Sequence, residues 1–161
     1  MNGMNVTLSK LTRILPKTIE NAYNGSPLAK HTFLVITMVT IVRSLIHIFA
    51  ADGGAQSIAT MPLDSYTPAG AAAVITMFSL WGLSQLLMGL VYVVVYLRYT
   101  SLIPAMYVLL ISEYTLRIVI GIMKPIVTGG TVPGSIGNFV LVPLCVIMLA
   151  LSLRRGKEYT Y

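Results

Sequence analysis

Charged residues are scarce in this chain of 161 residues. Asp, Glu, Lys and Arg together make up 10% of the sequence, whereas hydrophobic residues make up 56%. A soluble domain carries about 25% charged residues, and the mean hydropathy of +0.81 agrees with this difference. Together with four long apolar runs, the composition excludes an ordinary soluble enzyme, a disordered tail and a collagen-like rod. It leaves open an enzyme that works inside a membrane.

Side chains for metal and redox chemistry are also few. The single cysteine, Cys145, excludes an internal disulfide and argues against a cysteine-based metal site. Two histidines and one cysteine are too few for the usual haem, copper or iron–sulfur sites. The sequence contains no HExxH, Walker, GxSxG or CxxC motif. We therefore expect no metal ion and no cofactor.

Four apolar runs have the length of membrane-spanning helices, which need roughly 20 residues. We predict these spans at residues 31–51, 69–97, 102–123 and 136–153. The second span is long, so we expect it to tilt or to extend beyond the bilayer. The first run is too long for a signal peptide and lacks a small-residue cleavage site, so we expect it to be retained. The predicted fold class is all-α, an integral membrane four-helix bundle.

The basic residues predict that both termini lie in the cytoplasm. Connection 52–68 contains no Lys or Arg, and connection 124–134 contains only Lys124. The other connection, the N-terminal segment 1–30 and the tail 154–161 are basic, and basic segments face the cytoplasm. Their basic residues are Lys10, Arg13, Lys17, Lys30, Arg98, Arg154, Arg155 and Lys157. Because these residues flank apolar runs, the net charge of +6 does not indicate nucleic-acid binding.

The N-terminal segment has a pattern of its own. Val6, Leu8, Leu11, Ile14 and Leu15 approximate one face of a helix, and the basic residues lie elsewhere. This composition suits a short amphipathic helix on the surface of the cytoplasmic leaflet. A partly ordered tail is the alternative.

Five polar residues inside the predicted spans are candidate ligand-binding residues. Charged side chains in a bilayer are costly, so they face the bundle interior, water or a ligand. A rise of 1.5 Å per residue places the two arginines roughly 10–12 Å below the outer ends of their spans. Arg43 and His47 are four residues apart, as are Glu113 and Arg117, so the members of each pair lie on the same face of their helix. The candidates are Arg43 and His47, Glu113 and Arg117, and Gln85.

The charges of this group do not balance within the spans. Glu113 can neutralise one arginine, but no second carboxylate lies in a predicted span. Asp52 or Asp64 could fold inward from the first connection, or an anion such as a lipid phosphate or a substrate carboxylate could complete the site. Three other interpretations stay open: an Arg–Glu pair that locks helices together, arginines that snorkel to the interface, and proton-linked chemistry.

Two segments of the second half carry a resemblance. SEYTLRIVIGIMKPI and the later TVPGSIGNFVLVPL, together with an arginine in the first span, resemble small bacterial membrane proteins of the DoxX-like four-helix group. The resemblance covers residues 33–153, and its best residues are Arg43, Arg117 and Gly121. It implies a four-helix fold in a bacterial cytoplasmic membrane. The group has no single established chemistry, so no activity is implied.

These observations favour a binding protein over an enzyme. We expect a lipid or other amphiphilic anion to bind between the helices, or the chain to act as an accessory subunit of a membrane complex. Its expected partners are membrane lipids and either further copies of the chain or a larger assembly. The first alternative is a small proton-linked transporter that works as an oligomer through Glu113. The second is a membrane enzyme for a lipid-soluble substrate, with His47 or Glu113 moving protons.

Overall fold

The computed structural model describes residues 13–154. Within this part of the chain, four long helices and two short 3₁₀ turns follow one another, and no strand is formed. Each long helix is long and apolar enough to cross a membrane. The predicted all-α class is therefore confirmed, with four candidate membrane spans. The elements are α2 (Pro27–Phe49), η1 (Leu63–Ser65), α3 (Pro68–Arg98), η2 (Thr100–Leu102), α4 (Ile103–Met123) and α5 (Pro133–Ser152).

Proline marks the start of every long helix. Pro27, Pro68 and Pro133 are first residues, and Pro104 is the second residue of α4. Proline suits this place because its φ is already helical and its missing N–H would be unpaired in the first turn anyway. The helices α2 and α5 begin a few residues before the spans predicted from residues 31 and 136. The apolar pattern begins only after these polar first turns.

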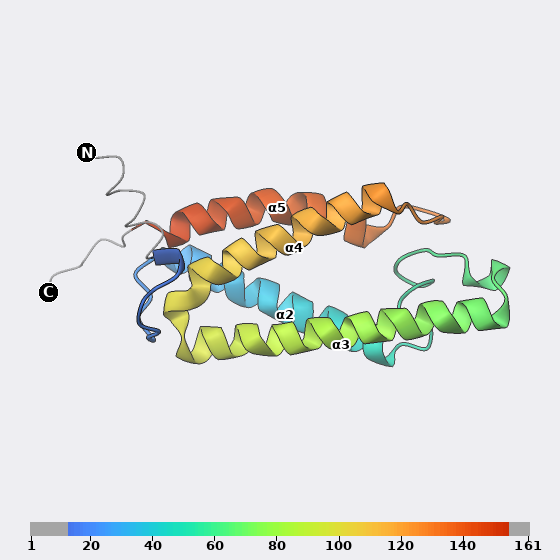
Figure 1. The fold of residues 1–161 in the computed structure, drawn as a ribbon, viewed down its shortest axis with the longest axis horizontal. Coiled ribbons are helices and arrows are strands. Elements are labelled where there is room, and N and C mark those ends of the chain that lie inside the picture. The colour runs from blue at the N-terminus through green and yellow to red at the C-terminus, as the bar shows by residue number, and fades with distance from the viewer. Residues whose placement is uncertain (1–12, 155–161) are drawn as a thin grey trace, which may run out of the picture.

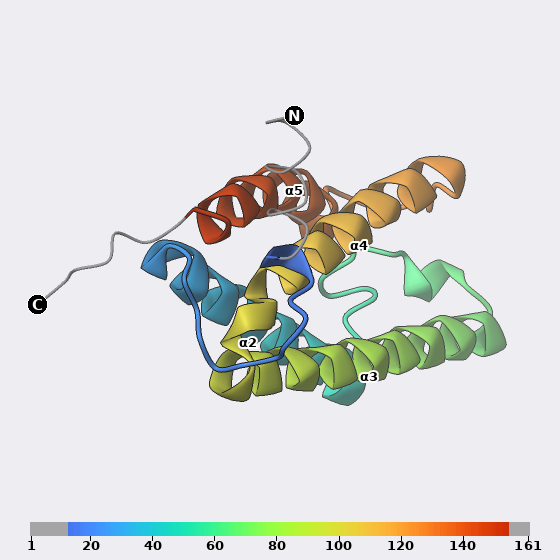
Figure 2. The same ribbon diagram turned by 60° about the vertical axis from the view of Figure 1, so that its left-hand side comes forward.

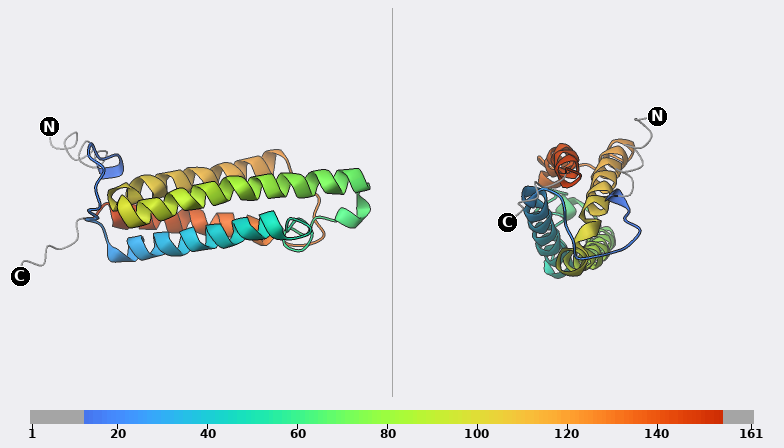
Figure 3. Two further views of the ribbon diagram at one scale, coloured as in Figure 1. Left: turned by 90° about the horizontal axis from the view of Figure 1, so that it is seen from below. Right: turned by 90° about the vertical axis from the view of Figure 1, so that its left-hand side faces the viewer.

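The helices are arranged as two pairs. α2 packs along α3, and α4 packs along α5 (Figure 1). The pairs lie close together at the end where α3 turns into α4, and they diverge toward the end that carries the loops 50–67 and 124–132 (Figure 1). The end-on view in Figure 3 shows that the helices form one bundle. α3 has 31 residues and extends beyond its neighbours at the loop end, as the same figure shows.

Aromatic side chains close the end where the pairs converge. The ring of Phe33 lies edge-on to the rings of Tyr92 and Tyr107, with centroids 5.5 Å and 5.9 Å apart. The Tyr107 hydroxyl donates to the Ala29 carbonyl oxygen at 2.6 Å, which ties α4 to α2. Such edge-to-face pairs stabilise a core beyond the area they bury. This end is therefore the packed core of the bundle.

The loop 50–67 is an ordered unit at the other end. The Asp52 carboxylate accepts hydrogen bonds from the backbone N–H groups of Gly54, Gln56 and Ser57. The loop packs against the first half of α3 and lies between α3 and α4 (Figure 2). Gly129 N–H donates to the Thr60 carbonyl oxygen at 2.8 Å, so this loop also contacts the connection before α5.

Neither acidic residue of this loop partners an arginine. Asp52 accepts hydrogen bonds from its own loop, and Asp64 accepts one from the Gln56 side chain at 2.6 Å. The expectation that one of them folds inward to complete the charge balance is therefore wrong. The reason is local, because backbone N–H groups in the turn already satisfy the Asp52 carboxylate.

The described ends of the chain meet at the packed end of the bundle. The Arg13 guanidinium donates to the Leu153 carbonyl oxygen at 2.7 Å, and Ser26 N–H donates to the Leu151 carbonyl oxygen at 3.2 Å. Both ends thus lie on one side, as four spans require. Their cytoplasmic orientation stays a prediction. Residues 6–11 of the predicted amphipathic helix and residues 155–161 of the tail lie outside the described residues.

Candidate functional site

Three of the five candidate residues lie around the Trp81 indole ring, and the other two hydrogen-bond to the arginines. Arg43 and His47 lie on α2, Gln85 on α3, and Glu113 and Arg117 on α4. The Trp81 side chain on α3 contacts residues from both other helices. The Cζ atom of Arg117 lies 4.8 Å from the indole centroid and that of Arg43 lies 5.8 Å from it. Two guanidinium groups therefore share one aromatic ring as a cation–π partner.

Gln85 connects α3 to Arg43. The Arg43 Nε–H donates to the Gln85 Oε1 atom at 3.1 Å, and Gln85 is only 4% exposed. This bond fixes the orientation of the amide, because the opposite orientation would bring its NH₂ group against another donor. The Gln85 Nε2 donor is then left with no hydrogen-bond partner among residues 13–154.

Glu113 and Arg117 form an ion pair within α4. The Arg117 Nη2 atom donates to the Glu113 Oε1 atom, and both side chains are partly buried. This is the only ion pair within the described part of the chain. The buried Nε–H donor of Arg117 finds no acceptor among the same residues. The predicted pairing is present, and it leaves hydrogen-bonding capacity on the arginine.

His47 anchors the loop 50–67 to the site. Its Nδ1 atom lies 2.7 Å from the Gly53 carbonyl oxygen, and the residue is 4% exposed. Because a carbonyl oxygen only accepts, Nδ1 carries the proton, and Nε2 of the neutral ring is an acceptor. The ring packs against Trp81 and Phe78, with centroids 4.8 Å and 5.6 Å away. His47 thus reaches the arginines through Trp81, and its donor is already used.

Two aromatic residues complete the group. Trp81 is 36% exposed and lies within cation–π distance of both arginines. Tyr114 was not predicted; it is buried, and its ring centroid lies 5.8 Å from the Arg117 Cζ atom. The available signal was helical spacing, because Trp81 lies four residues before Gln85 and Tyr114 three before Arg117.

The site carries one positive charge more than it neutralises. Arg43 and Arg117 contribute two positive charges, and Glu113 contributes one negative charge. Buried donors without acceptors cost free energy, and an unpaired charge in the bilayer costs more. A carboxylate or phosphate oxygen satisfies both deficits, because guanidinium groups bind these planar or tetrahedral anions with several hydrogen bonds. Anion binding is therefore the chemistry for which this arrangement is suited.

The described residues place no group of three or more His, Cys, Asp and Glu side chains where it could hold a metal ion. The chain matches no family model, no curated protein and no solved structure. The resemblance to the DoxX-like group therefore stays a prediction.

Proposed function

We propose that the chain is a membrane binding protein that holds an amphiphilic anion between α2, α3 and α4. The carboxylate or phosphate head of the ligand contacts Arg43 and Arg117. The observation that carries this proposal is the pair of buried donors without acceptors in residues 13–154, Gln85 Nε2 and Arg117 Nε, beside an uncompensated positive charge. Buried polar groups in native proteins nearly always have a partner, so two exceptions on residues of this group support a ligand.

The surroundings favour a ligand that also has an apolar part. The site lies within three helices that are apolar enough to cross a membrane, which favours a ligand with an apolar part. Trp81 is partly exposed and lies within cation–π distance of both arginines. An acyl or isoprenoid chain extending from the head group would contact this ring and the apolar faces beside it.

Native mass spectrometry tests this proposal. The protein is extracted gently from its own membrane as wild type and as the Arg43→Gln/Arg117→Gln double variant. We expect a small-molecule adduct of defined mass on the wild type and its loss from the double variant. Lys17→Gln/Lys124→Gln is the matched control, because it removes two exposed positive charges outside the site and should keep the adduct.

Two results would contradict the proposal. The first is an adduct that persists on a folded double variant, which would place the ligand elsewhere. The second is a folded wild type without any adduct but with a stoichiometric protein partner, which would make the charges structural. Circular dichroism of each variant establishes that it is folded.

A further inference from the structure

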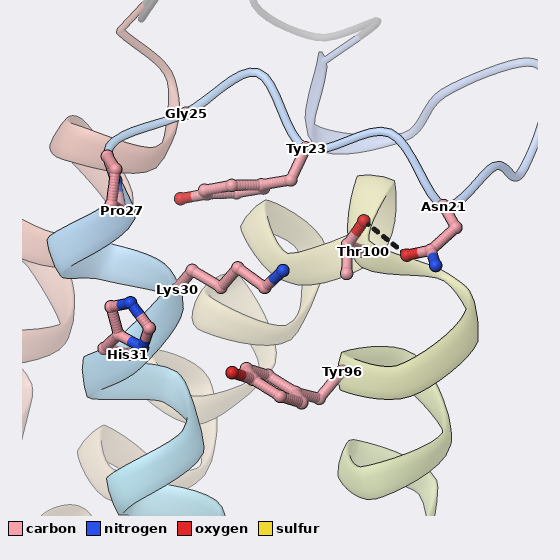
Figure 4. A pocket seen from close by; sticks show the side chains of 8 residues that line it. All are labelled: Asn21, Tyr23, Gly25, Pro27, Lys30, His31, Tyr96 and Thr100. Carbon is pink, nitrogen blue, oxygen red and sulfur yellow. Dashed lines mark hydrogen bonds between the residues drawn. The ribbon is translucent and has the colours of Figure 1, made fainter.

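A second concave site lies at the packed end of the bundle, far from Arg43. Its cavity has a volume of about 440 Å³ and is drawn in Figure 4. The segment 21–26 passes over the first turn of α2 and the last turn of α3, and the cavity lies beneath it (Figure 4). The lining residues are Asn21, Tyr23, Gly25, Pro27, Lys30, His31, Tyr96 and Thr100.

The depth of this cavity matches the head-group layer of a bilayer. It is formed by the ends of α2 and α3, just where both apolar spans stop. Lys30 and Arg43 are thirteen residues apart on α2. That spacing corresponds to roughly 20 Å along the helix axis. The cavity is therefore distinct from the site around Trp81.

The cavity has positive charge without a matching negative charge. Lys30 lies in the first turn of α2, where the helix dipole is already positive and acidic residues are favoured. That turn contains no acidic residue, and the Ser26 side chain does not cap it. The Lys30 Nζ atom lies 5.3 Å from the Tyr96 ring centroid, and it forms no ion pair within residues 13–154.

One buried hydroxyl of a lining residue lacks a hydrogen-bond partner, as do the donors around Trp81. The Tyr23 hydroxyl is buried and has no hydrogen-bond partner among the residues that the structure describes. Burial raises the pKa of Tyr23 to about 12, so the group keeps its proton and can donate. Figure 4 shows Lys30 extending between the rings of Tyr23 and Tyr96.

The polar side chains on the opposite wall of the cavity, Asn21 and Thr100, already have hydrogen-bond partners. The Thr100 hydroxyl donates to the Asn21 Oδ1 atom at 2.9 Å (Figure 4). The Asn21 amide donates to the Leu97 carbonyl oxygen at 3.3 Å. The free groups of the cavity are therefore donors and cations, and no carboxylate lines it.

We propose that this cavity binds a phosphate group through the Lys30 ammonium, and that the Tyr23 hydroxyl, which Figure 4 shows directed toward Pro27, turns to donate to the same phosphate. Phosphate supplies the negative charge and the acceptor oxygens that these donors lack. A water molecule takes about 30 Å³ of liquid volume. The space of about 440 Å³ is therefore enough for a phosphate with its glycerol substituent. The phosphate can belong to an anionic lipid or can be free in solution, and the experiment distinguishes the two sources.

The test measures binding of two probes to the detergent-purified full chain by native mass spectrometry. The probes are a short-chain phosphatidylglycerol and inorganic phosphate. We expect Lys30→Gln and Tyr23→Phe to weaken binding about tenfold each, because each removes one hydrogen bond to a charged group. Lys30→Arg should bind nearly as the wild type does. Lys17→Gln, which removes an exposed charge outside the cavity, should leave the affinity unchanged.

The results distinguish a lipid head group from free phosphate, or they overturn the proposal. Saturable binding of the lipid alone identifies a head-group site, and competition by inorganic phosphate at equal affinity identifies a soluble ligand. The proposal is overturned if neither probe binds the folded wild type. It is also overturned if Lys30→Gln and Tyr23→Phe both bind like Lys17→Gln. Should Lys30→Gln fail to fold, Tyr23→Phe and Lys30→Arg still give the answer.

Discussion

The side-chain amide of Gln85 contacts Arg43 and keeps one donor without a partner among the described residues. Gln85 accepts from Arg43 with its oxygen and presents a free, buried NH₂ donor on its other side. A glutamate at this position would keep the acceptor and replace the free donor with a second acceptor. It would also cancel the unpaired positive charge.

We therefore predict that Gln85→Glu folds but loses the anionic ligand. The new carboxylate pairs with Arg43, so the attraction for an external anion disappears and the adduct seen by native mass spectrometry is lost. Thr18→Glu is the control, because it adds the same charge at an exposed position outside the bundle. An adduct that survives in folded Gln85→Glu would show that the unpaired charge does not hold the ligand.

At the residue scale, helical spacing predicted which polar residues meet, because residues four apart share a face. That rule predicted that Arg43 shares a helix face with His47 and Glu113 with Arg117. All four residues belong to the group around Trp81. The rule does not give rotamers. The use of the His47 donor by Gly53 and the free donors of the site therefore had to be seen in three dimensions.

At the scale of helices, the contact between α2 and α3 depends on small residues. A Cβ atom added at Gly82 would lie 2.7 Å from the His47 Cβ atom and 3.0 Å from the Ser44 carbonyl oxygen. The Ser44 oxygen is a backbone atom and the His47 Cβ atom is bonded to the backbone, so neither can move aside. The helices α2 and α3 would therefore have to separate. Gly89 makes a similar approach, with an added Cβ atom 2.9 Å from the Ile41 Cγ1 atom. Gly82 and Gly89 therefore allow α2 and α3 to pack closely.

We predict that Gly82→Ala lowers the free energy of unfolding by about 1–3 kcal/mol, the usual cost of overpacking. Gly121→Ala is the matched control, because an added Cβ atom there meets nothing within 4 Å. The control should leave stability unchanged or raise it by up to about 1 kcal/mol, since alanine favours a helix more than glycine does. Unfolding in mixed micelles, followed by circular dichroism, compares the two. Equal stabilities would show that α2 and α3 are not in such close contact.

The loop 50–67 depends on the charge of Asp52. Partial burial alone would raise the pKa of this carboxyl, but hydrogen bonds from Ser57, Gly54 and Gln56 outweigh it and lower the pKa to about 2. The unfolded value is about 3.9. A lowered folded-state pKa contributes stability that is complete above the unfolded value and is lost as the pH falls through the folded one.

We therefore predict that the stability difference between the wild type and Asp52→Asn is constant above about pH 5 and shrinks as the pH falls toward 2. Thermal unfolding at a series of pH values measures it. Asp64→Asn is the control; this exposed carboxylate accepts only from the Gln56 side chain, and we expect a smaller effect. A difference that does not change with pH would contradict the role assigned to the Asp52 charge.

Helices and loops were not equally predictable. The four spans follow from long apolar runs, because backbone groups in a bilayer must be paired within a helix. The helices start at prolines that lie before the apolar pattern begins, so α2 and α5 begin before the predicted spans. The cavity beneath segment 21–26 leaves no pattern in the sequence, because it exists only where that segment crosses two helix ends.

For the whole molecule, the basic residues predict that the packed end faces the cytoplasm and the loop end faces outward. Single cysteines in a Cys145→Ser background test this orientation. We expect Ser57→Cys, at an exposed position of the loop 50–67, to react with a membrane-impermeant maleimide in intact cells. Lys17→Cys, at an exposed position of the opposite end, should react only after permeabilisation. The reverse pattern would show the opposite topology and place the cavity beneath segment 21–26 on the outer side.

The molecule thus has unsatisfied buried donors around Trp81 and beside Lys30, as well as the Tyr92 hydroxyl in the packed core. We propose above all that the group around Trp81 binds an anion. The most direct measurement is an experimental structure of the protein purified with its native lipids. It should show non-protein density within hydrogen-bond distance of Gln85 Nε2 and Arg117 Nε. If both donors instead bond to protein groups, and the space between Arg43 and Arg117 contains no ligand, the account is contradicted.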